Sequence, residues 1–146
     1  MKPLPIVQGE ERTALNARWP EPVLLLSDEE RERRVRSGND TVMLDDEGGK
    51  RGFVRAVLTV PLGHPMASVY GVFVEVDRRA YATLKQANQS KEPARVWGKL
   101  ATRLPFLDDA VGADVEIFED GSDRRCRVVA AKSALIIDGP PVGARR

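Results

Sequence analysis

The sequence predicts an α+β domain with a mostly antiparallel sheet of about five to seven strands and two helices. Several short runs alternate apolar and polar residues, and glycine-bearing turns rather than long helical crossovers connect them. Two other segments have N-cap residues followed by helical spacing. A chain of 146 residues with 42% hydrophobic and 31% charged residues can bury a core as one domain.

The first predicted helix lies in "LSDEERERRVRSGND", residues 26–40. Ser27 is placed as its N-cap, Glu30 completes a capping box, and Gly38 is expected to end it in the left-handed conformation. Its acids and arginines alternate along the chain, so we interpret it as a solvated surface helix rather than an anion or nucleic-acid site. The second predicted helix is "DRRAYATLKQAN", residues 77–88, with Asp77 as its N-cap.

The central prediction is a hairpin of two long strands, 51–61 and 68–76, preceded by a short strand at 41–46 and an "EGGK" turn. Alternation gives these strands one apolar face, formed by Val54, Ala56, Leu58 and Val60 and by Tyr70, Val72, Val74 and Val76. The opposite faces are mixed and carry Phe53, Val57 and Phe73, and Arg55 is expected to pair with Glu75 across the strands.

The remaining segments are less regular. Residues 1–22 contain four prolines and are expected to form an irregular arm, with one helical turn at 14–19. Residues 23–138 form the single domain, and 139–146 a loose tail. Within the domain, 94–104 fits either a helix or a strand, because Gly98 weakens a helix and Pro105 ends the segment. Residues 114–120 and 124–131 are expected to form a final hairpin, and 133–138 a last strand or helical turn.

The chain has one histidine and one cysteine. His64 lies in a Gly-His-Pro turn, and we interpret it as the tip of the long hairpin rather than as a catalyst. Cys126 lies between arginines in a predicted strand and fits a small, half-buried strand residue. Neither has metal-ligand spacing around it, so we expect no metal site, no Cys–His nucleophile pair and no cofactor.

Other chemistries lack their motifs. The carboxylate doublets at 45–46, 108–109 and 119–120 place their side chains on opposite faces of a strand, which does not fit a glycosidase pair. The sequence shows neither a phosphate-binding glycine loop nor a nucleophile elbow. With 23 basic and 22 acidic residues, little charge attracts nucleic acid or an anionic membrane. A single cysteine and the lack of an apolar leader favour the cytoplasm.

What remains is a surface for recognition. Five residues of interface-forming types are expected to line a groove on the mixed sheet face: Arg55, Tyr70, Phe73, Trp97 and Arg103. A competing interpretation places them in the core and at its rim. The mixed face needs cover from the arm, from 94–104 or from a second chain, and a homodimer is slightly favoured.

Three functions stay open. The leading one is a non-enzymatic domain that binds another protein or itself, and no nucleic acid or membrane. The alternative is a small-molecule binder or hydrolytic enzyme with a groove near Trp97. The third is an immunity protein that neutralises a toxin.

From Leu26 to about Asp138 the order of features resembles a bacterial family catalogued as a domain of unknown function (the 2199 group). The resemblance is carried by "LSDEERERRVRSGNDTVMLDD", "GFVRAVLTVPL", "SVYGVFVEVDRRAY" and "VWGKLATRLPFLDDAVGADVEI". Many relatives begin with a Cys-x-x-Cys-Gly stretch, whereas this chain begins "MKPLPIVQGEE" and has no cysteine there. The resemblance therefore implies the order of the fold, and it implies neither a metal site nor an activity.

Overall fold

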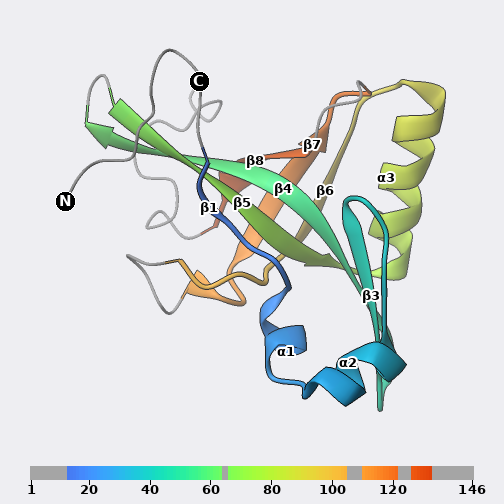
Figure 1. Cartoon of the computed structure of the whole chain (residues 1–146). Coiled ribbons are helices and arrows are strands. Elements are labelled where there is room, and N and C mark those ends of the chain that lie inside the picture. Colours follow the sequence, from blue (N-terminus) through green and yellow to red (C-terminus); the bar gives the residue numbers. More distant parts are fainter. Residues whose placement is uncertain (1–12, 64–65, 105–109, 122–125, 133–146) are drawn as a thin grey trace.

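The computed structural model describes residues 13–63, 66–104, 110–121 and 126–132, which form three helices and one eight-stranded sheet (Figure 1). The elements in chain order are β1 (Thr13–Asn16), α1 (Glu21–Leu24), α2 (Asp28–Arg34), β2 (Val35–Ser37), β3 (Thr41–Asp46), β4 (Gly49–Gly63), β5 (Met66–Val76), α3 (Arg78–Ser90), β6 (Ala94–Leu100), β7 (Asp114–Glu119) and β8 (Cys126–Ala131). The predicted class, α+β with a mostly antiparallel sheet, is confirmed.

The sheet closes on itself through strands β4 to β8. Its order is β1-β5-β6-β7-β8-β4-β3-β2, and a further β5–β4 pairing joins the ends of the inner five strands into a barrel. Two pairings, β1–β5 and β4–β8, are parallel, and the others are antiparallel. Closure removes the exposed edges that an open sheet of these strands would present.

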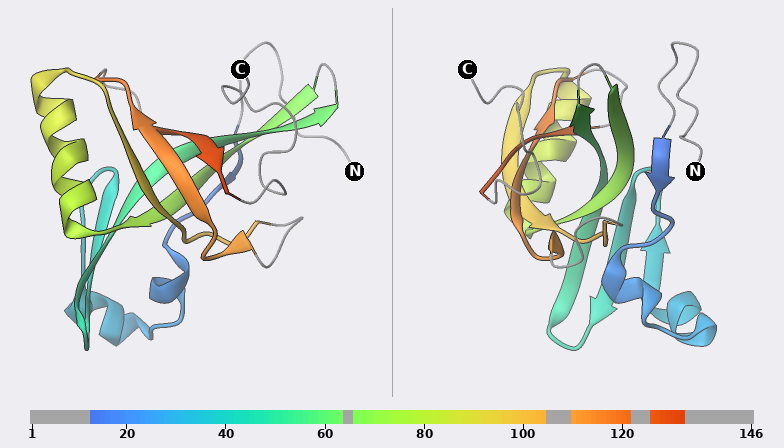
Figure 2. Two further views of the ribbon diagram at one scale, coloured as in Figure 1. Left: turned by 180° about the vertical axis from the view of Figure 1, so that it is seen from behind. Right: turned by 90° about the vertical axis from the view of Figure 1, so that its left-hand side faces the viewer.

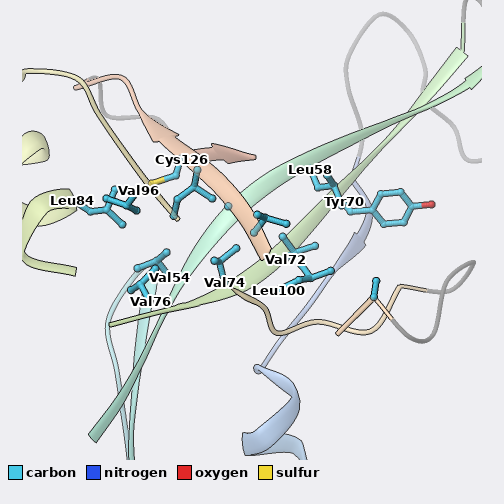
Figure 3. Close-up of a cluster of buried hydrophobic side chains, with 14 of the residues drawn as sticks. Val54, Leu58, Tyr70, Val72, Val74, Val76, Leu84, Val96, Leu100 and Cys126 are labelled. Atoms are coloured by element: carbon cyan, nitrogen blue, oxygen red, sulfur yellow. The ribbon is translucent and has the colours of Figure 1, made fainter. Parts of the chain in front are cut away.

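The two longest strands, β4 and β5, form a hairpin at the centre of the sheet, and the left view of Figure 2 shows them side by side. Its register, with Val54 opposite Val74 and Ala56 opposite Val72, places the predicted apolar face inside the barrel. These residues join one buried cluster with Leu100, Val115 and Ile117 (Figure 3). The predicted pairing and face assignment are therefore confirmed for the described side chains.

Each strand of this hairpin changes partner along one edge. The first part of β4 pairs with β3, up to the pair Thr41–Val54, and the next part pairs with β8, from the pair Ala56–Cys126. One edge of β5 likewise passes from β6 to β1. We call the place where β3 and β8 diverge from β4 the β4 fork.

The mixed face of the hairpin is covered by the chain itself. Phe53 and Phe73 are fully buried in a second cluster with Val23, Val42, Leu44 and Ala101. Trp19 and Leu26, which flank α1, pack against this cluster. Phe53 and Phe73 therefore have cover within one chain, which is the alternative to a dimer that the sequence left open.

The two predicted helices form, with one change of boundary. Ser27 and Glu30 make the capping box of α2, and Asp77 accepts a hydrogen bond from the Ala80 amide at the start of α3. The expected stop at Gly38 is wrong, since α2 ends at Arg34 and residues 35–37 form β2 against β3. Pairing with β3 stabilises these residues more than another helical turn with few apolar contacts would.

Two further expectations are corrected. Part of the stretch expected to be an irregular arm is ordered: residues 13–16 form β1 instead of a helical turn, because the free edge of β5 offers backbone partners. Glu75 is bound by Arg51, whose Nε and Nη2 donate to its two carboxylate oxygens at 2.9 and 2.8 Å. The register explains this, since Arg55 lies opposite Phe73 and not opposite Glu75.

The ambiguous segment 94–104 begins with a strand, β6. Residues 114–119 and 126–131 form the expected final hairpin. His64 and residues 133–138 lie outside the described residues. None of the described helices is long and apolar enough to cross a membrane.

Candidate functional site

The five residues expected to line one groove lie in different surroundings. Tyr70 belongs to the barrel cluster, whereas Phe73 is fully buried in the second cluster on the other side of the sheet. Figure 3 places Tyr70 beside Leu58, at the end of the cluster away from α3. Arg55 lies over the Phe73 ring at 4.6 Å and donates to the Ala17 carbonyl at 2.8 Å. These three residues therefore do not form a common open surface.

Trp97 and Arg103 remain at the surface. Trp97 is 45% exposed on β6, with the Lys132 amine 5.3 Å from its ring centre. A groove of about 290 Å³ does lie beside Trp97, lined by Glu75, Gly98, Lys99 and Asp114 among others. Arg103 lies 3.6 Å from Glu21 of α1. The charges of the Trp97 groove are already used within the protein, since Lys99 bonds Asp114 at 2.7 Å and Arg51 binds Glu75.

A second cavity, of about 230 Å³, lies at the β4 fork, and we call it the fork cavity. Its lining comes from both sides of the divergence: Asp40, Thr41, Val54, Arg55, Glu119 and Cys126 from the strands and their ends, and Tyr81, Leu84, Lys85 and Asn88 from α3. The Arg55 amide donates to the Asp40 carbonyl at 2.9 Å, which fixes the rim where β3 begins. The cavity exists because two strands separate from β4 and α3 covers the gap.

Helix α3 turns one face to this gap. Tyr81, Leu84, Lys85 and Asn88 recur at helical spacing and so lie along one side of the helix. Leu84 is buried, and Figure 3 shows it at the end of the apolar cluster with Val96 and Cys126. Lys85 and Asn88 are exposed, so the apolar residue faces inward and the polar ones lie at the mouth.

The inner wall of the fork cavity carries a buried carboxylate. Glu119 is only 5% exposed, and it follows Val115 and Ile117 on the inward face of β7. Its Oε1 accepts a hydrogen bond from the Cys126 thiol at 3.4 Å, and its Oε2 accepts one from the Gly121 amide at 3.1 Å. Both donors are neutral.

The acids that flank Glu119 have cationic partners, and Glu119 has none in the described part of the chain. Glu116 lies 3.7 Å from Arg95, and Asp120 lies 3.6 Å from Arg127. Within the described residues, the hydrogen bonds of the Glu119 carboxylate come from the thiol and the amide. A buried carboxylate without a counter-charge is costly, so Glu119 is the candidate site residue of this wall.

Burial and the neighbouring Glu119 carboxylate raise the pKa of the Cys126 thiol to about 12. A thiol with this pKa is protonated at neutral pH and is a poor nucleophile. Cys126 therefore acts in this site as a hydrogen-bond donor to Glu119. The described residues also contain no group of three or more His, Cys, Asp or Glu that could hold a metal ion.

Glu119 is the site residue that sequence reasoning misses. The pattern presents it as one member of an acidic doublet at a strand end, whose two side chains point to opposite faces. The same alternation contains the signal, because Val115, Ile117 and Glu119 share the face that packs into the barrel. A carboxylate in register with core residues is unusual and marks a candidate site.

The chain matches the model of a bacterial family, described as "Uncharacterized protein conserved in bacteria (DUF2199)", over residues 8–133. The protein belongs to this family. The match spans the barrel and α3, so the fork cavity lies within the DUF2199 region. No curated protein and no solved structure matches the chain.

Proposed function

We propose that this DUF2199 protein is a small-molecule-binding domain whose ligand occupies the fork cavity, with Glu119 as the polar anchor. The observation that carries this proposal is a carboxylate 5% exposed on a cavity wall, bonded only to neutral donors in the described residues. Val54, Leu84 and Tyr81 supply the apolar part of the wall. Polar residues, among them Lys85 and Asn88, also line the cavity, and an apolar wall combined with placed polar groups is typical of ligand sites.

The proposal places binding at the fork rather than near Trp97. The charged side chains of the Trp97 groove already have partners within the protein: Lys99 binds Asp114, Arg51 binds Glu75, and Asp77 accepts from the Ala80 amide, which leaves little for a ligand to replace. Hydrolysis through Cys126 finds no support, because the raised pKa keeps the thiol protonated. Non-enzymatic binding, in the cytoplasm where a single free thiol stays reduced, fits these properties best.

The test is an NMR titration of the isotope-labelled full chain with mixtures of amines, amino acids, carboxylates, nucleosides and sugars. A ligand of the fork cavity shifts the backbone amide signals of Val54, Leu84, Glu119 and Gly121. The Asn88→Trp variant, which places an indole at the mouth, should weaken binding at least tenfold. Gln86→Trp, on an exposed position of α3 outside the cavity, is the matched control. Shifts confined to other surfaces would contradict the proposal.

Binding of another protein is the second candidate, and one observation favours it. Leu24 and Leu25 of the α1 region are 49% and 84% exposed, and large exposed side chains of this kind often contact a partner. A partner recovered with the wild-type chain and lost with Leu25→Ser would support this function. Recovery unchanged by Leu25→Ser would remove its support.

A further inference from the structure

We propose that the ligand of the fork cavity is a small organic cation, with a primary ammonium or amidinium group paired to Glu119. This inference rests on the proposed function and specifies its ligand. It follows from the hydrogen bonds of one carboxylate, the charges around it and the size of the cavity.

The Glu119 carboxylate has unused capacity for hydrogen bonds. Its two oxygens provide about four acceptor sites, and the described structure fills two of them, from the Cys126 thiol and the Gly121 amide. A ligand N–H can fill the remaining sites. Hydrogen bonds from a charged donor are shorter and about twice as strong as those from neutral donors, so an ammonium group gains more here than a hydroxyl group.

The charge at the inner wall also selects for a cation. Of the other charged residues in the lining, Asp40 and Lys85 are exposed at the mouth, and the Arg55 guanidinium lies over the Phe73 ring and donates to the Ala17 carbonyl. Glu119 lacks a cationic partner in the described residues, whereas the flanking Glu116 and Asp120 each have an arginine. A bound ammonium ion supplies the missing counter-charge at a site from which water is largely removed, where opposite charges attract more strongly than in water. An anionic ligand would instead meet the carboxylate directly.

An organic cation fits this wall better than a metal ion. Divalent metals need several oxygen, nitrogen or sulfur ligands, and the described residues provide no group of three such side chains. The apolar side chains of Val54 and Leu84 suit a hydrocarbon body attached to the charged group. A cavity of about 230 Å³ is smaller than the usual range for drug-sized ligands, so the body is compact.

The experiment compares three probes with the same four-carbon body: n-butylamine, 1-butanol and butanoate. Each is titrated at neutral pH into the labelled full chain, and the backbone amides of Glu119 and Gly121 are followed by NMR. We expect n-butylamine to bind at least tenfold more tightly than 1-butanol, and butanoate to bind least. Equal or tighter binding of 1-butanol or butanoate at these amides overturns the cation inference and leaves the fork cavity standing as a small-molecule site.

The Glu119→Gln variant tests the anchor. Gln keeps the size of the side chain, its carbonyl oxygen can accept from Gly121, and its amide can donate to the Cys126 sulfur after the thiol rotates. We expect this variant to lose at least tenfold in affinity for n-butylamine and to keep its affinity for 1-butanol. Glu116→Gln, on the same strand and half-buried, is the matched control and should bind n-butylamine as the wild type does.

Two further outcomes separate the cation inference from the proposed function. If the metabolite mixtures shift the fork amides and n-butylamine does not, the cation inference is overturned while the proposed function holds. If neither the mixtures nor the three probes shift these amides, both are overturned. Should Glu119→Gln unfold, the wild-type ranking of the three probes by charge still decides the inference.

Discussion

The Cys126 thiol and the Glu119 carboxylate form a donor–acceptor pair inside the barrel, 3.4 Å apart. Burial disfavours the thiolate, and the adjacent carboxylate would repel its negative charge. The pKa of Cys126 is therefore raised from 9.0 to about 12. The folded state holds this proton more tightly than the unfolded chain does. The resulting stabilisation is complete below about pH 9 and is lost as the pH rises towards 12.

We predict that the native Cys126 thiol reacts slowly with a disulfide reagent such as dithiobis(nitrobenzoate) at mildly alkaline pH, and rapidly after denaturation. We also predict that the wild type loses more stability than Cys126→Ala between pH 9 and pH 12, measured by urea unfolding. The variant lacks the titrating thiol and serves as the control. Fast labelling of the folded protein, or parallel stability curves for the two proteins, would contradict the placement of the thiol.

Asp46 is another residue whose titration the structure perturbs. Its Oδ1 accepts from the Glu47 amide at 2.8 Å, and its Oδ2 accepts from Arg51 at 3.2 Å. First the Glu47 amide and then Arg51 lower the pKa of this carboxyl below 3.8. The folded state thus favours the ionised form, so the stabilisation is present above about pH 4 and is lost as the pH falls through the folded-state pKa.

Asp46→Asn should lower the urea unfolding midpoint at pH 7, and its difference from the wild type should shrink as the pH falls through the lowered pKa of Asp46. The neighbouring Asp45→Asn variant is the control. Asp45 pairs with the exposed Lys50 at 3.1 Å, and exposed pairs contribute little. If the midpoints of the wild type and Asp46→Asn differ by the same amount at pH 7 and at pH 2, the charge of the Asp46 carboxylate does not contribute to stability.

At the scale of the element, Gly98 in β6 explains why this segment forms a strand, where local propensity allowed either a helix or a strand. A Cβ atom on Gly98 would lie 2.5 Å from the Glu75 carbonyl oxygen and 2.7 Å from a Val74 methyl group. These atoms belong to β5, the neighbour of β6 in the barrel. The glycine is present because the two backbones approach closely, and it does not mark a helix break.

Gly98→Ala should destabilise the protein by about 1–3 kcal/mol, as overpacking of a rigid contact usually does. The clash is with a backbone oxygen, which cannot move aside as a flexible side chain can. Gly48→Ala in the β3–β4 turn is the matched control, because nothing lies within 4 Å of the added methyl group and the cost should be below about 0.5 kcal/mol. Equal midpoints for both variants in urea would contradict the close approach.

At the scale of the whole molecule, residues before α2 complete the second apolar cluster. Trp19 and Leu26 cover Phe53 and Phe73, while β1 occupies part of the free edge of β5. Removing this segment uncovers an aromatic surface and a strand edge together. The N-terminal segment therefore acts as part of the domain.

We predict that the full chain sediments as a monomer in analytical ultracentrifugation and that a chain lacking residues 1–20 associates as its concentration rises. A chain lacking residues 1–12 keeps β1 and Trp19 and should remain a monomer. A full-length dimer that persists at micromolar concentration would restore the case for self-association. A monomeric 21–146 chain would show that Trp19 is dispensable as cover.

Local patterns in the sequence determined the parts of this protein that depend on neighbouring residues. The capping box at Ser27 and Glu30, the cap at Asp77 and the strict alternation along β4 and β5 each act within a few positions, so they were predictable. The alternation that places Val115 and Ile117 inside also reaches Glu119. That inward face is readable from the sequence, although alternation alone does not show that a cavity lies beside it.

Tertiary structure alone decided what lies around those faces. The parallel contact of β8 with Ala56 and Val57 closes the barrel and opens the β4 fork, and it joins segments that are far apart in the sequence. Neither alternation nor capping specifies which distant edge a strand will share. The local β7–β8 hairpin brings Cys126 to Glu119, and the non-local β4–β8 pairing places both of them beside Val54 and α3 in the lining of the cavity. The cavity is therefore a property of strand order, which is set by the packing of the whole chain and not by any one segment.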